Sequence, residues 1–396
     1  MLIRNASLLY GRELSYVAGT DVKVSGRYIE QVGKNLRPAR GELVIDCEGL
    51  LMIPGFVNSH THIGDSIGKD VAIDSSVESK IHPVSGFKQQ ILKRSQAGHL
   101  ASFIRNSCIS MIRKGITTFV DFREGGLEGI EILKKASSGI PIRPIILGRI
   151  NYYQDSRLIR QNSSLPDSKK SDLAALLKNC NGLGISGPNE FSDSTLKYFA
   201  EQKTMCAIHS AETKQSNNIS KKRTKKTETQ RALLAKPTLL VHMTFASKHD
   251  LFLAAKNRAS IVVCPRANGA LAEGIPDVNL MIKTGCNVTI GTDNVMVNSP
   301  DMFREMDYVW KTSMGTSKTR ISPRSILKMA TVNAARTLGN KIGIIQANSF
   351  ADFIFVEKHS IDLEPMHNPH AAIVHRASEN TIRAVMFEGD IVHGKI

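Results

Sequence analysis

Two histidines separated by a single residue, His60 and His62, end the segment PGFVNSHTH, which starts as an apolar, strand-like run. Side chains at positions i and i+2 of a strand project from the same face, so both imidazoles can reach one ion. Neutral imidazole nitrogen is a good ligand for zinc, iron and related metals. An isolated H-x-H pair is more often accidental, so the pair indicates a metal site only if further ligands lie nearby.

Three more polar residues follow apolar runs of the same kind. His209 lies in MCAIHSAE, His242 in LLVHMTF and Asp293 in VTIGTDN. Each alone could be a core histidine bonded to the backbone, or an aspartate that caps a helix. Side chains at the carboxyl ends of barrel strands, however, point into one shared mouth. We therefore expect these residues and the histidine pair to converge on one metal site.

The elements that must position these residues are visible as apolar runs. From about Ile53 onward, eight such runs alternate with helix-like segments, a pattern that predicts repeated βα units. The runs are FVNSHTH, ITTFVDF, IRPIILGRI, GLGISG, TMCAIHSAE, TLLVHMTF, ASIVVCPR and CNVTIGTD. Eight is the strand number of a (β/α)8 barrel, although runs this short could also be turns of buried helix. The first and last fifty residues carry shorter runs that predict additional β-structure.

Composition excludes some classes of protein. The chain has 396 residues, of which 41% are hydrophobic, so it is not mainly disordered. Its formal net charge of +16 makes nucleic acid or an anionic ligand worth considering. The six cysteines form no C-x-x-C pair, which disfavours a cysteine-based zinc site. The first residues lack the apolar stretch and cleavage site typical of a signal peptide, and no apolar run of 18 or more residues occurs in the sequence. We therefore expect a reduced, cytoplasmic protein without a membrane span.

Two polar stretches interrupt the βα pattern. Residues 154–171 predict a surface loop, and residues 213–231 are strongly basic. The basic stretch directly follows His209 and Glu212, so it must leave the barrel at its mouth. A charge run of this kind is usually a solvated, mobile loop. The alternative is a flexible lid whose lysines attract an anionic substrate.

Six segments together resemble the amidohydrolase superfamily, specifically its cytosine deaminase, guanine deaminase and chlorohydrolase-like branch. They are PGFVNSHTH at 54–62, HSAE at 209–212, LVHM at 240–243, IGTDN at 290–294, ILKMATVNAARTLG at 326–339 and ADFIFVE at 351–357. The resemblance implies an α/β fold, a distorted (β/α)8 TIM barrel with a small β-sandwich built from both termini. The expected domain boundaries are 1–53 and 345–396 for the two parts of the sandwich and 54–344 for the barrel.

The resemblance also implies roles for individual residues. It implies one divalent metal ion, zinc or iron, held by His60, His62, His209 and Asp293. Glu212 matches the catalytic glutamate, and His242 matches a histidine that contacts the attacking water or the substrate. Asp293 is also catalytic, since it can take a proton from that water. No lysine in GLGISGPNE stands out as a bridge between two metals, so we expect a mononuclear site.

Residues for substrate binding are less clear. In CPRAN, Arg266 and Asn268 could touch substrate, or the segment could be a plain turn. Asp65 and Lys69 could line the mouth or be solvated loop charges. The loop after His62, residues 63–83, matches no family pattern for a particular base.

Three functions remain open. Hydrolytic deamination of a purine, pyrimidine or related amino-heterocycle is favoured, because Glu212 can protonate a ring nitrogen. The second is hydrolysis of another C–N or C–Cl bond, as in a cyclic amide or a halogenated triazine. The third is a non-enzymatic scaffold or nucleic-acid-binding protein, against which the complete ligand set argues. We expect a small-molecule substrate, which could be anionic. We expect no membrane partner, and a nucleic-acid partner is disfavoured. A homo-oligomer is left open.

Overall fold

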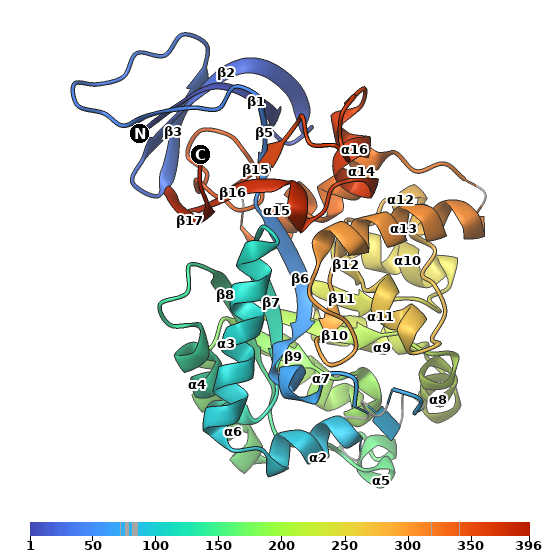
Figure 1. Cartoon of the computed structure of the whole chain (residues 1–396). Coiled ribbons are helices and arrows are strands. Elements are labelled where there is room, and N and C mark those ends of the chain that lie inside the picture. Colours follow the sequence, from blue (N-terminus) through green and yellow to red (C-terminus); the bar gives the residue numbers. More distant parts are fainter. Residues whose placement is uncertain (72, 76–78, 81–85, 318, 340) are drawn as a thin grey trace.

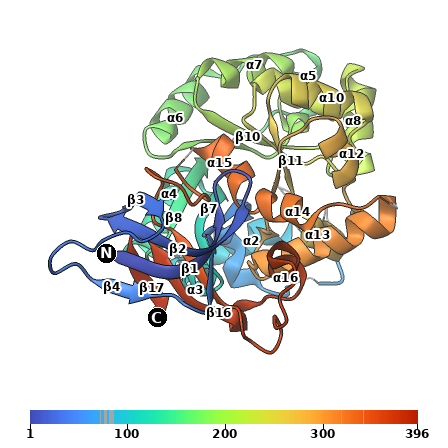
Figure 2. The same ribbon diagram turned by 90° about the horizontal axis from the view of Figure 1, so that it is seen from above.

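Two β-sheets organise the chain in the computed structural model (Figure 1). The structure describes residues 1–396 except 72, 76–78, 81–85, 318 and 340, so part of the unassigned loop after His62 lies outside the described residues. In Figure 1 a curled sheet and its helices lie below, and strands from both chain ends form the second sheet above. Figure 2 shows the same second sheet from above, with both termini beside it.

The curled sheet has nine parallel strands, of which eight neighbour each other in chain order. All eight strands predicted from the apolar runs form, so the predicted α/β barrel-type fold is confirmed. The ninth strand follows the eighth after Gly291 and Thr292 and pairs with the first, which makes the sheet curl back on itself. The strands are β6 (Phe56–His62), β7 (Ile116–Arg123), β8 (Arg143–Gly148), β9 (Gly182–Ile185), β10 (Met205–Ser210), β11 (Leu239–His242), β12 (Ser260–Val263), β13 (Val288–Ile290) and β14 (Asp293–Asn294).

Helices connect these strands and flank the curled sheet (Figure 1). Strands β7, β9 and β11 are buried along their whole length, as expected for parallel strands covered on both faces. The connecting helices are η1 (Ile63–Gly68), α2 (Phe87–Arg94), α3 (Ala97–Arg113), α4 (Gly126–Ser137), α5 (Ser156–Arg160), α6 (Asp167–Leu177), η2 (Pro188–Glu190), α7 (Asp193–Glu201), α8 (Lys214–Thr224), α9 (Glu228–Ala232), η3 (Leu233–Ala235), α10 (Lys248–Lys256), α11 (Pro265–Ala270) and α12 (Val278–Lys283). After β14 come α13 (Met302–Ser317), α14 (Pro323–Met329) and α15 (Val332–Leu338).

The second sheet is mixed and joins the two ends of the chain. Its N-terminal strands are β1 (Leu2–Tyr10), β2 (Ser15–Ser25), β3 (Tyr28–Gly33), β4 (Val44–Asp46) and β5 (Leu50–Pro54). Its C-terminal strands are β15 (Phe353–Glu357), β16 (Ile382–Phe387) and β17 (Asp390–Gly394), with α16 (Pro369–His375) and η4 (Glu379–Thr381) between them. The ends meet where β15 pairs antiparallel with β5. The chain changes sheet between Pro54 and Phe56; the domain boundaries named above stay predictions.

Both polar stretches are more helical than predicted. The expected loop at 154–171 contains α5 and the start of α6, because Asp155 caps α5 by accepting from the backbone of Arg157 and Leu158. The basic stretch 213–231 forms α8 and most of α9, which ends at Ala232. Thr227 begins α9 with a capping box, a signal that the charge run obscured.

Arg231 within the basic stretch is not a solvated charge. Its side chain is fully buried, donates to Asp193 at 2.8 Å and also donates to the carbonyl of Phe191. The prediction of a solvated loop is therefore wrong for this residue. The exposed charges are concentrated in the later half of α8 and the turn after it. Among the described helices, none is both long and apolar enough to span a bilayer.

Candidate metal centre and substrate cavity

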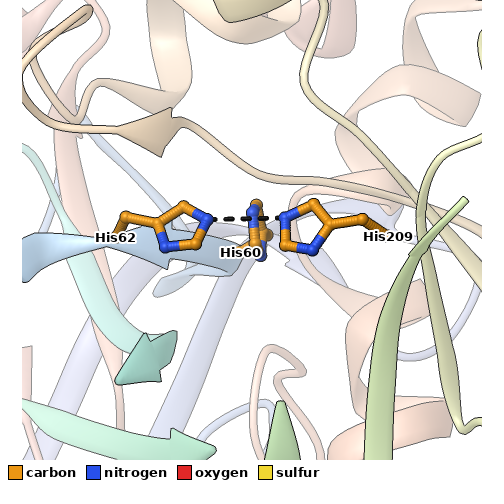
Figure 3. Close-up of side chains that lie close together, drawn as sticks. All are labelled: His60, His62 and His209. Carbon is orange, nitrogen blue, oxygen red and sulfur yellow. Dashed lines mark hydrogen bonds between the residues drawn. The ribbon is translucent and has the colours of Figure 1, made fainter. Parts of the chain in front are cut away.

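Three histidines from two strands surround one point at the carboxyl end of the curled sheet (Figure 3). His60 and His62 project from β6 and His209 projects from β10, so the i, i+2 spacing does bring two imidazoles together. Their ligand nitrogens all lie within 4.8 Å of one another. His62 Nε2 and His209 Nε2 face each other at 3.4 Å, with His60 drawn between the two rings.

Hydrogen bonds on the far sides of two rings decide which nitrogen carries the proton. His62 Nδ1 lies 2.8 Å from Glu124 Oε1, and His209 Nδ1 lies 3.3 Å from the carbonyl oxygen of Ile185. Because both partners are acceptors, each Nδ1 donates and each Nε2 keeps a free lone pair. Burial lowers the pKa of His62 to about 3 and lowers the pKa of His209 well below its ordinary value. Two neutral imidazoles therefore aim lone pairs at each other, an arrangement that a shared cation satisfies.

Asp293 adds a carboxylate to this cluster. Its Oδ1 lies 3.2 Å from His60 Nε2 and 3.6 Å from His62 Nε2. Burial raises the pKa of Asp293, but the hydrogen bond with His60 and the neighbouring histidines outweigh burial, so the net pKa lies below its ordinary value. Ligand atoms about 2.0–2.1 Å from a tetrahedral zinc ion lie about 3.4 Å apart. The observed spacings of 3.2–3.6 Å fit a small divalent ion.

The backbone reaches this geometry through strained conformations at the strand ends. His242 and Asp293 have φ angles of 70° and 59°. Residues other than glycine rarely adopt this left-handed region, which costs on the order of 1–3 kcal/mol. Gly291 is needed between β13 and β14, because a Cβ at this position would lie 2.7 Å from the Cβ of His60. Strain held by packing at strand ends is typical of functional sites.

Glu212 and His242 lie beside the cluster. His242 Nδ1 donates to Asn268 Oδ1 at 3.2 Å, and Thr244 fixes the amide of Asn268. His242 Nε2 consequently keeps a lone pair, 3.3 Å from Glu212 Oε1. Burial raises the pKa of Glu212 well above its ordinary value, and the negative charges of Asp293 and Glu228 raise it further. The raised pKa makes Glu212 suited to hold a proton and donate it.

Buried charges support His62 on the side away from the cluster. Glu124, directly after β7, contacts His62 and also the Nζ of Lys88, at 2.7 Å. Lys88 from α2 lies 3.3 Å from Asp65, and Arg149 lies 3.8 Å from Glu124. Burial raises the pKa of Glu124, but Lys88 and His62 outweigh burial, so its net pKa is well below the ordinary value. Glu124 therefore remains an ionised acceptor for His62.

A cavity of about 580 Å³ opens beside the cluster. The predicted residues that line it are His62, His209, Glu212, His242 and Asp293. His60 is fully buried and does not line it. The other walls come from α2, from residues 149–156, from the segment after β9, and from α8. The cavity thus gives a ligand access to the cluster and to Glu212.

The structure does not bring the predicted substrate contacts to this cavity. Arg266 lies 3.2 Å from Glu305, and Asn268 orients His242; neither lines the cavity. Asp65 is buried against Lys88, whereas Lys69 is exposed, and they do not line it either.

Sequence reasoning missed four charged residues of this region: Lys88, Glu124, Arg149 and Glu190. Glu124 and Arg149 directly follow β7 and β8, so the strand-end rule that identified His209 could have found them. Lys88 and Glu190 carry no comparable signal.

Comparisons with known proteins identify relatives of this chain and a solved structure with a similar fold. The model of the amidohydrolase family matches residues 51–392. A protein named "Putative aminohydrolase" from Methanothermobacter thermautotrophicus is 36% identical over 396 residues, covering 99% of each chain. The 5-methylthioadenosine/S-adenosylhomocysteine deaminase of Pyrococcus furiosus is 28% identical, covering 99% of this chain and 94% of its own. The crystal structure of a zinc-bound adenosine deaminase from Xanthomonas campestris has a TM-score of 0.84 at 21% identity, covering 98% of this chain and 92% of that one.

Proposed function

The chain belongs to the amidohydrolase family, and on that premise we propose that it is a metal-dependent deaminase of a purine-like amino-heterocycle. The observation that most directly supports this proposal is the position of Glu212. Its side chain lines the same cavity as the histidine–aspartate cluster, and its Oε1 lies 3.3 Å from His242 Nε2. A deaminase needs such a proton donor, because a ring nitrogen must be protonated before water adds to the neighbouring carbon. The deaminase names of two related proteins support the same reaction.

We propose that His60, His62, His209 and Asp293 hold one divalent ion, zinc or iron. The Nε2 atoms of His62 and His209, whose lone pairs face each other across 3.4 Å, support this assignment. When bound, such an ion lowers the pKa of a coordinated water from 15.7 to about 7 and so supplies hydroxide near neutral pH. Histidine and carboxylate ligands suit both zinc and iron, and the zinc in the related adenosine deaminase favours zinc.

The residues of the chain then move protons around the reacting carbon. Asp293 takes a proton from the attacking water, and His242 contacts that water or the substrate. Glu212 donates its proton to the ring nitrogen, which makes the adjacent carbon electrophilic. As the C–N bond breaks, the exocyclic amine takes the proton that Asp293 received and leaves as ammonia. The ring nitrogen keeps the proton from Glu212, and the hydroxyl proton of the addition intermediate returns to Glu212 as the C=O bond forms. The basic surface of α8 at the cavity rim supports a substrate that carries negative charge.

The cytoplasmic location and a homo-oligomer stay predictions.

Ammonia release from the metal-loaded protein tests this function. The panel contains purine and pyrimidine bases, their nucleosides and nucleoside 5′-phosphates, and amino- or chlorotriazines. Ammonia from at least one purine-like member is expected, whereas chloride release alone would replace deamination by dehalogenation, and no product from any member would contradict the proposal.

Glu212→Gln separates proton transfer from metal binding. We expect turnover to fall at least about 100-fold, the low end for general acid–base catalysis, while one ion per chain is retained. Elemental analysis and steady-state kinetics measure the two quantities, and exposed Glu128→Gln serves as the matched control. Normal turnover by Glu212→Gln would remove the assigned role.

A further inference from the structure

Glu228 is the first residue of α9 and a buried carboxylate to which the proposed reaction assigns no role. The residue is 4% exposed and borders the cavity. Helix α9 does not need this side chain for its own start, because Thr227 begins the helix with a capping box. A buried carboxylate requires hydrogen-bond donors, so the donors that Glu228 has acquired indicate what it holds.

The donors to Glu228 come from three segments that border the cavity. The backbone N–H of Ala211 donates to Oε2 at 2.8 Å, and Ser216 Oγ donates to the same oxygen at 2.7 Å. The side-chain nitrogen of Asn189 donates to Oε1 at 3.0 Å. Both carboxylate oxygens therefore bind groups of the chain itself, and Glu228 links the end of β10 to α8 and to the segment after β9.

Ala211 directly follows β10, at the turn where the chain leaves the curled sheet. Its φ angle is 49°, in the left-handed region that residues other than glycine rarely adopt. The carbonyl of Ala211 accepts from the N–H of Phe245 at 2.8 Å, and Ser210 Oγ lies 3.1 Å from Thr229 Oγ1 of α9. Contacts from outside the strand thus hold this turn, and Glu228 supplies the acceptor for its N–H.

Glu212 depends on this turn more than the proposed metal ligand of the same segment does. His209 lies within β10, which pairs with β11, and its Nδ1 donates to the carbonyl of Ile185. The pairing of β10 with β11 ends at Ser210, so Glu212 lies beyond the sheet. A proton donor must nevertheless be placed accurately, because a displacement of about 1 Å can lower a rate roughly 100-fold.

We infer that Glu228 is a positioning residue, which fixes the turn at Ala211 and thereby holds Glu212 where it can donate its proton. This inference rests on the proposed function, in which Glu212 is the proton donor. Glu228 acts through the backbone of the turn and does not contact the reacting ring. Its loss should therefore lower kcat and leave KM nearly unchanged.

A double-mutant cycle tests whether Glu228 acts through Glu212. Glu228→Met removes the carboxylate and leaves the buried N–H of Ala211 without its acceptor. In otherwise wild-type protein we expect kcat in the ammonia assay to fall about tenfold or more, with KM within about twofold. In the Glu212→Gln background the same change should lower kcat by less than about twofold, because the group that it positions is already absent. Equal losses in both backgrounds would overturn the inference and leave deamination intact.

Glu228→Gln separates the hydrogen bond from the charge of Glu228, which also raises the pKa of Glu212. Glutamine keeps a carbonyl oxygen for the N–H of Ala211, so we expect kcat to fall less than in Glu228→Met. An equal loss in both variants would assign the effect to charge and contradict the positioning role. Exposed Glu201→Met is the matched control and should keep kcat within about twofold of the wild-type value.

Metal content and thermal unfolding are measured for every variant. We expect one ion per chain in each, because the sheet holds His209 independently of Glu228. Loss of the ion from the Glu228 variants would show that this residue supports the metal ligand instead, and would overturn the inference. If Glu228→Met does not fold, Glu228→Gln is taken through the same cycle. No ammonia from wild-type protein with any member of the panel would overturn the proposed function, and the inference with it.

Discussion

Among single residues, His62 shows how a neighbouring side chain can orient a metal-binding imidazole from the side away from the metal cluster. Its Nδ1 donates a hydrogen bond to Glu124, and the Nζ of Lys88 lies 2.7 Å from Oε1 of Glu124. The carboxylate fixes both the ring orientation and the tautomer, so Nε2 is the atom left to face His209. Partners of this kind usually matter to metal affinity nearly as much as the ligands themselves.

Glu124→Gln should weaken metal binding without removing a ligand. The amide keeps the size of the side chain but lacks the charge that holds both Lys88 and the Nδ1 proton of His62. We expect metal affinity to fall about 10–100-fold, measured by competition with a chelator of known affinity. Exposed Glu131→Gln is the control. Metal affinity equal to that of the control would show that His62 does not depend on Glu124.

Among the helices, α8 shows that the basic stretch 213–231 is ordered and borders the cavity. The stretch is helical rather than a loop, and Ser216, Ile219 and Arg223 line the cavity. Lys221, Lys222 and Lys225 are exposed nearby, whereas Lys226 contacts Asp193 at 2.6 Å. Among the described residues the first three lysines have no ion-pair partner, and they lie on the helix that borders the cavity or in the turn after it.

Replacing Lys221, Lys222 and Lys225 with serine tests whether this field steers an anionic substrate. If it does, the KM of the variant should rise several-fold at low ionic strength and depend less on salt concentration. Its kcat should stay nearly unchanged, because long-range attraction speeds the diffusional encounter with substrate and does not act on the chemical step. Kinetics across a salt series measure both effects. The control replaces Lys34, Lys256 and Lys283, which are exposed but do not line the cavity. An unaltered KM at low salt would leave α8 as a solvated helix only.

At the scale of the whole molecule, Arg143 joins the two sheets. It starts β8 of the curled sheet and donates to Asp352 and Glu388, which flank strands of the mixed sheet, at 2.7 Å each. Its guanidinium also lies 4.2 Å from the ring centre of Phe350. Asp352 is almost fully buried. Its carboxylate is paired with Arg143 from the other sheet and also accepts from the backbone N–H of Glu388 at 2.9 Å.

Arg143→Met should therefore destabilise the whole chain. The variant keeps an apolar stem but leaves Asp352 as a buried carboxylate without its cation, and removing one partner of such a pair costs about 3 kcal/mol or more. Urea unfolding compared with exposed Arg40→Met measures the loss. Equal stability of the two variants would mean that the sheets are held together by apolar packing instead.

The residues at the ends of the barrel strands could be predicted from the sequence. His60, His62, His209, His242 and Asp293 were predictable because each follows an apolar run long enough to be a buried strand, and parallel strands end at one common edge. Periodicity and polarity are local properties, so they can be read without knowing the rest of the fold.

The groups that surround those strand ends could not be predicted and become visible only in the folded chain. Lys88 and Glu124 meet across 36 residues, and Arg231, part of an apparently solvated run, is buried against Asp193. Arg266 and Asn268 do not line the cavity, while Ser186, Asn189 and Glu190 do. Such contacts depend on how loops and helices pack over the sheet, because a charged side chain becomes buried only when distant segments supply its partner.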